Sequence, residues 1–372
     1  MHKVDKYKIE YQTAENLTRV GIYALVDYLW TVRNPILEQS IYFLRHASAK
    51  RLSNNAALLA GYHYSRFRKK PYQWAMPASI SIEPTTACNL GCPECPSGLK
   101  KFSRPTGNLQ VDLLSNVLDE IGSYLQYLTF YFQGEPFIHP KMISLIRMAS
   151  ERGIFTATST NAHFINERTA GEIVESGLNQ LIISIDGTTQ EVYEQYRRNG
   201  SLEKVLEGTR QIIVARKKLR SQFPLVYFQF LVVKPNEHQI EEVEALGKKM
   251  GVDGVLFKTA QVYDFKNGNP LIPTIDKYAR YKAENDGTFS IKNNLLNQCW
   301  KMWQSCVLTW DGRMVPCCFD KDATHEMGRI GDASFRDIWF GGRYHAFRSS
   351  LLRSRSEIDI CKNCSEGTKV WA

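Results

Sequence analysis

Between residues 78 and 262, short runs rich in β-branched and aromatic residues alternate with longer stretches that repeat apolar residues at helical spacing. Strands that alternate with helices favour a parallel sheet joined by right-handed crossovers. Six such units fit a partial (β/α)6 barrel or an open doubly wound sheet, and in both folds ligands bind beyond the carboxyl ends of the strands. The predicted strands are 79–83, 128–133, 155–160, 181–186, 226–233 and 255–259, and the predicted helices include 111–122, 141–152, 167–175, 202–219 and 239–250.

The segments on either side of this core have different patterns. The first 77 residues repeat apolar positions at helical spacing, with breaks expected at Asn34-Pro35 and at Ser53-Asn54-Asn55. After the core, an Asp-Gly pair between two short apolar runs predicts a hairpin over 307–316. The predicted flanking helices are 14–33, 35–52, 54–69 and about 335–352. The predicted domains are a helical basic extension (1–77), an α/β core with its following linker (78–289) and a small α+β domain (290–372).

Composition describes an ordinary globular chain with an uneven charge. Of 372 residues, 43% are hydrophobic and 23% are charged, and no apolar run approaches the about 18 residues that span a membrane. The formal net charge is +9, and residues 1–80 hold 12 Lys and Arg against 5 Asp and Glu, whereas the rest hold 35 against 33. The basic excess therefore belongs to the N-terminal extension.

Three interpretations of this basic, aromatic extension stay open. It can be a solvated helical cap on the barrel, or it can contact an anionic membrane or a lipid-linked substrate, because apolar aromatic helices with a basic end favour interfaces. Nucleic-acid binding is disfavoured, since no nucleic-acid motif accompanies the charge.

Nine cysteines point to metal or redox chemistry. The first residues show no apolar segment of a signal peptide, so we expect a reducing cytosol, with membrane association as the variant that the extension suggests. In such a compartment, cysteines in a chain of this size serve metal or redox chemistry more often than disulfides.

Three of the cysteines, Cys88, Cys92 and Cys95, lie within eight residues directly after the first predicted strand. Three thiolates on a tight loop suit a [4Fe-4S] cluster that keeps one iron open for a small molecule. The alternative is a structural zinc ion, which normally needs a fourth ligand, such as His139 or a distant thiol.

This C-x3-C-x2-C loop at the start of a six-unit α/β domain resembles the radical S-adenosylmethionine (SAM) superfamily. Further elements of residues 78–262 occur in the order that this family shows, which implies a partial (β/α)6 barrel of the TIM type. They are Gln133-Gly134-Glu135-Pro136 after the second strand, Thr160-Asn161-Ala162 after the third, Ser184 and Asp186 after the fourth, and Arg197 beyond it.

The resemblance implies that these elements bind SAM: Glu135 its amino group, Asp186 its ribose and Arg197 its carboxylate. Their chemistry agrees, because carboxylates accept hydrogen bonds from ammonium and hydroxyl groups and guanidinium grips carboxylates. The alternative for each is ordinary turn chemistry or a solvated arginine. Three residues depart from the family pattern: Glu94, where many members have an aromatic, and Gln133 and Ala162, which replace glycines.

The other six cysteines lie beyond residue 290 and resemble the auxiliary-cluster domain of many radical SAM enzymes, in its shorter twitch form or its longer SPASM form. Six cysteines are too few to ligate two clusters fully, so we predict one auxiliary [4Fe-4S] cluster; a zinc site is the alternative. Cys306 and Cys318 are then not needed as ligands, although Cys306 could take the place of Cys299. Cys318 follows Cys317 in a predicted strand, so its side chain would point to the opposite face. The predicted ligands are Cys299, Cys317, Cys361 and Cys364.

The resemblance implies an enzyme of the oxidoreductase type that cleaves SAM reductively and takes hydrogen from a substrate. We expect a small molecule, glycan or lipid rather than a peptide, because the first 77 residues show no strand pattern, and an electron donor such as flavodoxin or ferredoxin. Lys258, at the end of the sixth strand, is a candidate substrate contact. The alternatives are a peptide maturase and a non-catalytic scaffold or electron carrier that binds zinc or an iron-sulfur cluster.

Overall fold

The computed structural model describes residues 35–367 and 370. The chain divides between Tyr42 and Phe43 into two units, residues 1–42 and residues 43–372. Helix α2 (Pro35–Arg45) begins in the first unit, and none of its side chains is buried. The predicted helix 14–33 lies outside the described residues.

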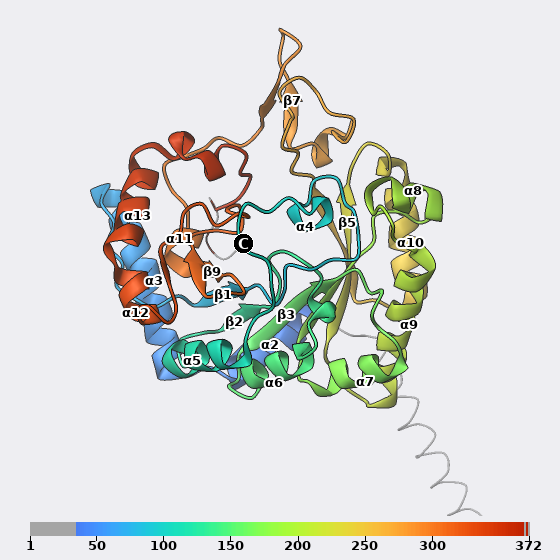
Figure 1. Ribbon diagram of the computed structural model, residues 1–372, viewed down its shortest axis with the longest axis horizontal. Coiled ribbons are helices and arrows are strands. Elements are labelled where there is room, and N and C mark those ends of the chain that lie inside the picture. Colours follow the sequence, from blue (N-terminus) through green and yellow to red (C-terminus); the bar gives the residue numbers. More distant parts are fainter. Residues whose placement is uncertain (1–34, 368–369, 371–372) are drawn as a thin grey trace, which may run out of the picture. The chain divides into compact units, whose positions relative to one another are not determined.

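The larger unit, residues 43–372, is built on a nine-stranded sheet with the order β11-β10-β9-β1-β2-β3-β4-β5-β6. Strands β1 to β6, which end this order, run parallel to one another, and Figure 1 shows helices α5, α6, α7, α9 and α10 in an arc along the outside of this sheet. The predicted partial (β/α) barrel is therefore confirmed. The parallel strands are β1 (Ser79–Ile82), β2 (Tyr127–Thr129), β3 (Phe155–Thr160), β4 (Gln180–Ser184), β5 (Leu225–Val232) and β6 (Gly254–Thr259).

The crossover helices form where the sequence places one apolar face against the sheet. Apart from the one-turn helix α4, each buries that face in the main core, and three of them begin with a side chain that accepts a backbone N–H: Asn166 before α7, Thr189 before α8 and Ser201 before α9. The helices of this part are α4 (Pro96–Leu99), α5 (Val111–Ile121), α6 (Met142–Ser150), α7 (Glu167–Glu175), α8 (Gln190–Tyr196), α9 (Leu202–Lys218) and α10 (Ile240–Met250).

The C-terminal segment extends the same sheet. Strand β9 (Ser305–Leu308) pairs in parallel with β1, and β10 (Arg313–Val315) returns antiparallel through the predicted turn, in which Gly312 has φ +85. Strand β11 (Gly328–Arg329) ends the sheet, and a hairpin of β7 (Tyr281–Ala283) and β8 (Phe289–Ile291) stands apart from it (Figure 1).

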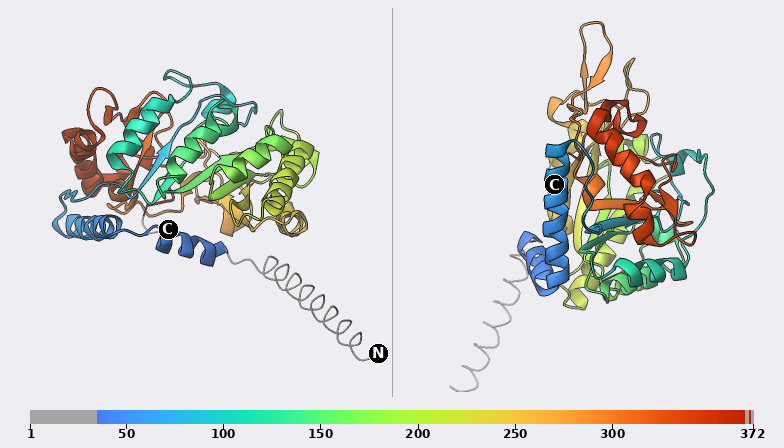
Figure 2. Two further views of the ribbon diagram at one scale, coloured as in Figure 1. Left: turned by 90° about the horizontal axis from the view of Figure 1, so that it is seen from below. Right: turned by 90° about the vertical axis from the view of Figure 1, so that its left-hand side faces the viewer.

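Helix α3 (Ala49–Arg68) belongs to the larger unit and packs on the C-terminal segment of the chain. Its inner face, with Leu58 and Tyr62, packs on Trp300, Trp303 and the helices that follow the sheet. Figure 2 shows the opposite side of α3 facing away from the sheet. The C-terminal helices are α11 (Lys301–Gln304), α12 (Phe335–Phe340) and α13 (Gly342–Ser354).

Two predicted helix boundaries are wrong. The break expected at Ser53-Asn54-Asn55 falls instead before α3, where Ser48 caps the helix, and Asn54 lies inside it. Asn54 is buried because its amide bonds both the N–H and the C=O of Met76, which compensates for a polar residue in a helix. The helix predicted over 335–352 is two helices, α12 and α13, separated at Gly341.

Candidate functional site

The cysteine loop follows β1 and is held by tight backbone contacts. The N–H of Cys95 bonds the carbonyl of Cys92 at 3.3 Å, and Cys95 then begins helix α4. A Cβ at Gly98 would lie 2.6 Å from the backbone nitrogen of Cys92, so only glycine allows this close approach. The loop thus brings the cysteines together without a long excursion of the chain.

The surroundings of these thiols are apolar. Cys88, Cys92 and Cys95 pack with a cluster drawn from the loops after several strands, including Leu90 and Val262. Burial raises the pKa of the Cys88 thiol to about 12 and also raises that of Cys92. Thiols whose pKa is raised in this way become thiolates only when nearby positive charge compensates them, and iron ions supply such charge. The residues therefore fit an iron-sulfur cluster.

The turn after β2 lies against this loop. Gly134 has φ +75, and a Cβ there would lie 2.2 Å from the carbonyl oxygen of Thr85. Its N–H bonds the Ser97 hydroxyl at 2.8 Å, and the N–H of Glu135 bonds the Ala87 carbonyl at 2.8 Å. The predicted Gln133-Gly134-Glu135-Pro136 element is thus fastened to both sides of the cysteine loop.

The two ends of this element have different partners. The side-chain oxygen of Gln133 lies 3.9 Å from the Cys95 sulfur, which donates to it. Pro136 begins a short 3-10 helix, η1 (Pro136–Ile138), for which Glu135 is the N-cap. Gln133 is therefore a neighbour of the cysteine loop, although glycine is more usual there.

The Glu135 carboxylate is buried and oriented by three donors. It accepts hydrogen bonds from the Thr160 hydroxyl at 2.7 Å, the Asn161 N–H at 2.7 Å and the Phe137 N–H at 3.2 Å. Burial raises its pKa, and these hydrogen bonds oppose the rise. The Asn161 amide also donates to Asn89 at 2.7 Å, which ties the end of β3 to the cysteine loop.

Ala162 occupies a backbone conformation that favours glycine. Its φ is +60, in the left-handed region, which costs a non-glycine residue roughly 1–2 kcal/mol. Its N–H bonds the Thr160 hydroxyl at 2.9 Å, and its carbonyl lies beneath Gly208, where a Cβ would approach within 2.5 Å. The glycine that the family often has here is thus replaced at a small strain.

Asp186 and Arg197 contact each other. Asp186 is fully buried; one of its oxygens pairs with the Arg197 guanidinium, and the other accepts the Leu231 N–H at 2.7 Å. Arg197 also points a nitrogen at the Cys92 sulfur, 3.8 Å away. Ser184, the last residue of β4, is buried as well. In this structure Asp186 therefore orients Arg197, a role that the sequence did not suggest.

The predicted auxiliary ligands line one cavity. The two spare thiols are not among the residues that line it: Cys306 is buried on β9, opposite Ile80 of β1, and Cys318 is exposed next to Cys317. The cavity is lined by all four predicted cysteines together with Arg355 and several apolar side chains. These four are Cys299, Cys317, Cys361 and Cys364.

Cys317 and Cys318 were expected to alternate across a strand, but they do not. Strand β10 ends at Val315, so both cysteines lie in a turn, and their side chains are hydrogen-bonded to each other. Strand alternation therefore cannot decide between them. Only Cys317 lines the cavity.

Two further residues at this cavity escaped the sequence analysis. Arg355 is fully buried and donates to the Cys364 sulfur at 3.2 Å and to the Glu366 carbonyl at 2.7 Å. Burial would lower its pKa, but the nearby cysteine thiolates more than offset this and raise it. Gly367 has φ +86, and a Cβ there would lie 2.4 Å from the Cys299 sulfur. A fixed cation and a cradle that excludes a methyl group both fit a buried cluster with thiolate ligands.

The proposed fourth zinc ligand is engaged elsewhere. His139 bonds the Leu109 carbonyl through Nε2 at 2.9 Å, and its Nδ1 accepts the Lys141 N–H at 3.1 Å. Both ring nitrogens are thus occupied by backbone groups. In the part of the chain that the structure describes, no three Cys, His, Asp or Glu side chains converge on a site for one metal ion.

Side chains from the C-terminal segment reach the rim of the cysteine loop. Glu94 accepts the Tyr263 N–H at 3.0 Å, and Lys321 lies over the Tyr263 ring at 4.7 Å. Lys258 is exposed on β6. Burial would raise the pKa of Glu366, but cationic neighbours, Lys258 among them, lower it overall.

Comparison with known proteins agrees with this geometry. Residues 82–246 match the radical SAM superfamily, and residues 299–365 match an iron-sulfur cluster-binding domain, SPASM. The chain therefore contains a radical SAM domain followed by a C-terminal SPASM-type domain. It is therefore a radical SAM enzyme, and these domains imply SAM and iron-sulfur clusters.

Relatives and solved structures share this organisation. The chain is 24% identical over 322 residues to a tungsten-containing aldehyde ferredoxin oxidoreductase cofactor-modifying protein of Pyrococcus furiosus, covering 77% of this chain and 86% of the relative. It is 29% identical to an AdoMet-dependent heme synthase of Methanosarcina barkeri, over 47% of this chain and 48% of the relative. The structure of Streptococcus suis SuiB bound to S-adenosylmethionine matches with a TM-score of 0.58 and 14% identity, over 78% of this chain and 73% of SuiB. None of the described helices is both long and apolar enough to cross a bilayer.

Proposed function

We propose that this enzyme holds two [4Fe-4S] clusters and acts as an oxidoreductase on a small molecule, glycan or lipid. Cys88, Cys92 and Cys95 would hold the first cluster, and three protein ligands would leave one of its irons for SAM. When bound, it supplies the electron that cleaves SAM to methionine and a 5′-deoxyadenosyl radical, which then takes hydrogen from the substrate. The observation that carries this proposal is the junction of the cysteine loop with Glu135 and Arg197 at the carboxyl ends of the strands.

The protein's own groups bind and orient SAM in this proposal. Glu135 has its position fixed by three donors, and its remaining lone pairs accept the SAM amino group. Arg197, oriented by Asp186, binds the SAM carboxylate. The apolar residues around the cysteine loop exclude water from the reacting groups. The other cofactor-binding residues that we propose are Gln133, Gly134, Pro136, Asn161 and Ser184.

The second cluster, bound by the four cysteines of the C-terminal cavity, makes net oxidation feasible. Cys299, Cys317, Cys361 and Cys364 would hold this cluster next to the fixed cation Arg355, and when bound it would supply an acceptor for one electron; a purely structural cluster would supply none and would leave the reaction redox-neutral. The electron donor is a small carrier such as flavodoxin or ferredoxin. Lys258 stays a candidate substrate contact, because its amine is exposed beside Glu366.

The described part of the N-terminal segment supports a substrate other than a peptide. Residues 35–68 form two helices, α2 and α3, and this part of the chain contains no strand with which a peptide could pair. The partner that we propose for this segment is a membrane or a lipid. Nucleic acid remains disfavoured as a partner.

Anaerobic reconstitution tests the proposed function. With SAM and a chemical reductant, the wild-type protein should release 5′-deoxyadenosine, detected by liquid chromatography and mass spectrometry. Cys88→Ala should abolish the release, and Cys306→Ala, a buried cysteine outside both sites, should retain it. If the wild type and Cys306→Ala bind iron stably but produce no 5′-deoxyadenosine, the result would support the scaffold or electron-carrier alternative instead.

A further inference from the structure

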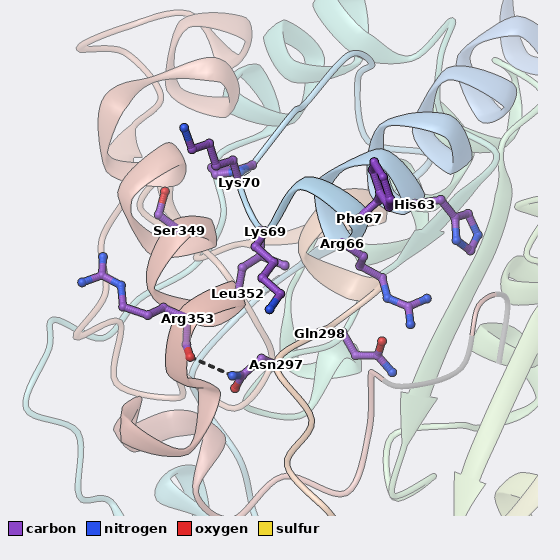
Figure 3. A pocket seen from close by; sticks show the side chains of 11 residues that line it. His63, Arg66, Phe67, Lys69, Lys70, Asn297, Gln298, Ser349, Leu352 and Arg353 are labelled. Atoms are coloured by element: carbon purple, nitrogen blue, oxygen red, sulfur yellow. Dashed lines mark hydrogen bonds between the residues drawn. The ribbon is translucent and has the colours of Figure 1, made fainter.

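A groove of about 830 Å³ lies where the end of α3 meets α13, away from both cysteine sites. Its walls come from three segments that are distant in the sequence: the end of α3 with the turn after it, residues 297–298, and α13. Figure 3 shows Arg66 at the right of the groove and Arg353 at the left, with Lys69 and Lys70 between them. Asn297 connects the walls, because its amide donates to the Arg353 carbonyl at 2.7 Å.

The groove is cationic and holds no compensating charge. Four of its residues, Arg66, Lys69, Lys70 and Arg353, are exposed cations, and no Asp or Glu is among its lining residues. Among the described residues, none of the four forms an ion pair with a carboxylate. Moreover, the chain contains no acidic residue between positions 39 and 82. The groove therefore has unbalanced charge that suits an anionic partner.

Exposed aromatic side chains border the same groove. Phe67 lines it with 80% of its surface exposed, and Trp74 is 51% exposed just beyond the turn. Tyr64 packs against Trp74 and Tyr72: its ring centroid lies 5.3 Å from that of Trp74 and 4.8 Å from that of Tyr72. Tyr and Trp gather at the headgroup level of membranes because they have one apolar and one polar end.

Helix α3 also presents an apolar outer stripe. Leu52, at the other end of the helix, is 58% exposed, and the exposed positions between it and Phe67 include Ala56 and Ala60. Taken by itself, α2 likewise buries no residue and exposes Ile36 and Leu44. Helices with exposed apolar side chains and Lys and Arg at one end are typical of proteins that lie on a membrane surface.

We propose that this groove is a docking site for an anionic phospholipid surface, with lipid phosphates between the α3 turn and Arg353 and with Phe67 inserted among the acyl chains. This sharpens the membrane contact proposed above and does not depend on SAM chemistry. Charge alone would also suit a free phosphate compound or an acidic protein. The exposed Phe67 and Trp74 favour the membrane, because neither a small anion nor a purely electrostatic partner would cover them.

Vesicle co-sedimentation of the full-length protein with its clusters tests the proposal. Phosphatidylcholine vesicles with about 30 mol% phosphatidylglycerol should bind the protein, and pure phosphatidylcholine should not. Replacing Lys69, Lys70 and Arg353 with Gln should weaken binding about 100-fold, at about one kcal/mol per cation. Phe67→Ala should also weaken binding to the vesicles. This loss should persist in about 0.5 M salt, whereas the loss caused by the three charge changes should not.

A matched control removes three exposed cations elsewhere: Lys217→Gln, Lys218→Gln and Lys248→Gln on α9 and α10. This control should bind vesicles as the wild type does, and both triple variants should release 5′-deoxyadenosine normally. Equal loss in both would mean that only net charge matters and would overturn the proposal. So would displacement from vesicles by millimolar inorganic phosphate, or binding to an acidic flavodoxin but not to vesicles.

Discussion

Asp186→Asn separates two roles for a residue that the sequence suggested as a ribose ligand. In the structure the Asp186 carboxylate is fully buried and pairs with Arg197, whose side chain is only 16% exposed. The change keeps the shape of the side chain and its acceptor for the Leu231 N–H, but it leaves the Arg197 charge without its partner. Breaking a buried pair in this way costs about 3–5 kcal/mol, and we expect the lower end because Arg197 retains some exposure and its contact with Cys92.

The expected cost can be measured as a melting temperature. For about 330 residues the entropy of unfolding is about 0.7 kcal/mol/K, so a loss of about 3 kcal/mol should lower the Tm by about 4 °C. Circular dichroism of the metal-free protein measures this change. SAM affinity of the reconstituted protein, measured by anaerobic calorimetry, should fall about 10- to 100-fold because Arg197 is no longer oriented.

A second buried pair in the same chain provides the control. Asp253 pairs with Arg216 and accepts the Val226 N–H at 2.6 Å, at the opposite ends of the strands. Asp253→Asn should therefore cost similar stability and leave SAM affinity unchanged. If Asp186→Asn melted with the wild type and lost only SAM affinity, Asp186 would be a ligand alone, and the inferred orienting role would be refuted.

Three further predictions concern the charge and packing of the sites. Burial raises the pKa of the Glu135 carboxyl above its ordinary value of 4.5. The metal-free protein should therefore lose stability as the pH rises above about 4.5, because the unfolded chain ionises this group at lower pH than the folded chain does. Measured against the Tm of the wild type, the Tm of Glu135→Gln should increase between about pH 5 and about pH 8. Gly367→Ala should lose auxiliary-cluster iron because its Cβ meets a cysteine sulfur, whereas Gly287→Ala, also at positive φ but with nothing within 4 Å, should not. Cys317→Ala should reduce iron from about eight to about four per chain, and Cys318→Ala should leave it unchanged, as measured by iron analysis and electron paramagnetic resonance. Retention of iron by Gly367→Ala would show that the loop moves aside, and loss of iron in Cys318→Ala would exchange the two ligand assignments.

Much of the fold was predictable because the signals are local. The strand and helix patterns of the core predict both ends of β3 and of α7 at the residues where the structure has them. The Asp-Gly pair likewise predicts the hairpin of β9 and β10. The order of the cysteine loop, Glu135 and Asp186 along the chain identified the site, because parallel strands end at one edge of a sheet.

What could not be predicted depends on contacts between distant residues. Asn54 is polar and was expected to end a helix, but Met76, which bonds it, lies 22 positions away. Arg355 resembles any other arginine until the fold buries it beside Cys364. Likewise, the pairing of Asp186 with Arg197 depends on the turn after α8, which no periodicity encodes.

The parallel pairing of β9 with β1 has a consequence for biosynthesis. Strand β1 leads directly into the cysteine loop, and one of its two hydrogen-bonding edges is completed only by residues 305–308, more than 200 positions later. During translation the loop is therefore exposed well before its supporting strand exists. Delivery of iron and sulfide to this loop should accordingly follow release of the whole chain from the ribosome, and a chain truncated before residue 300 should fail to retain the metal.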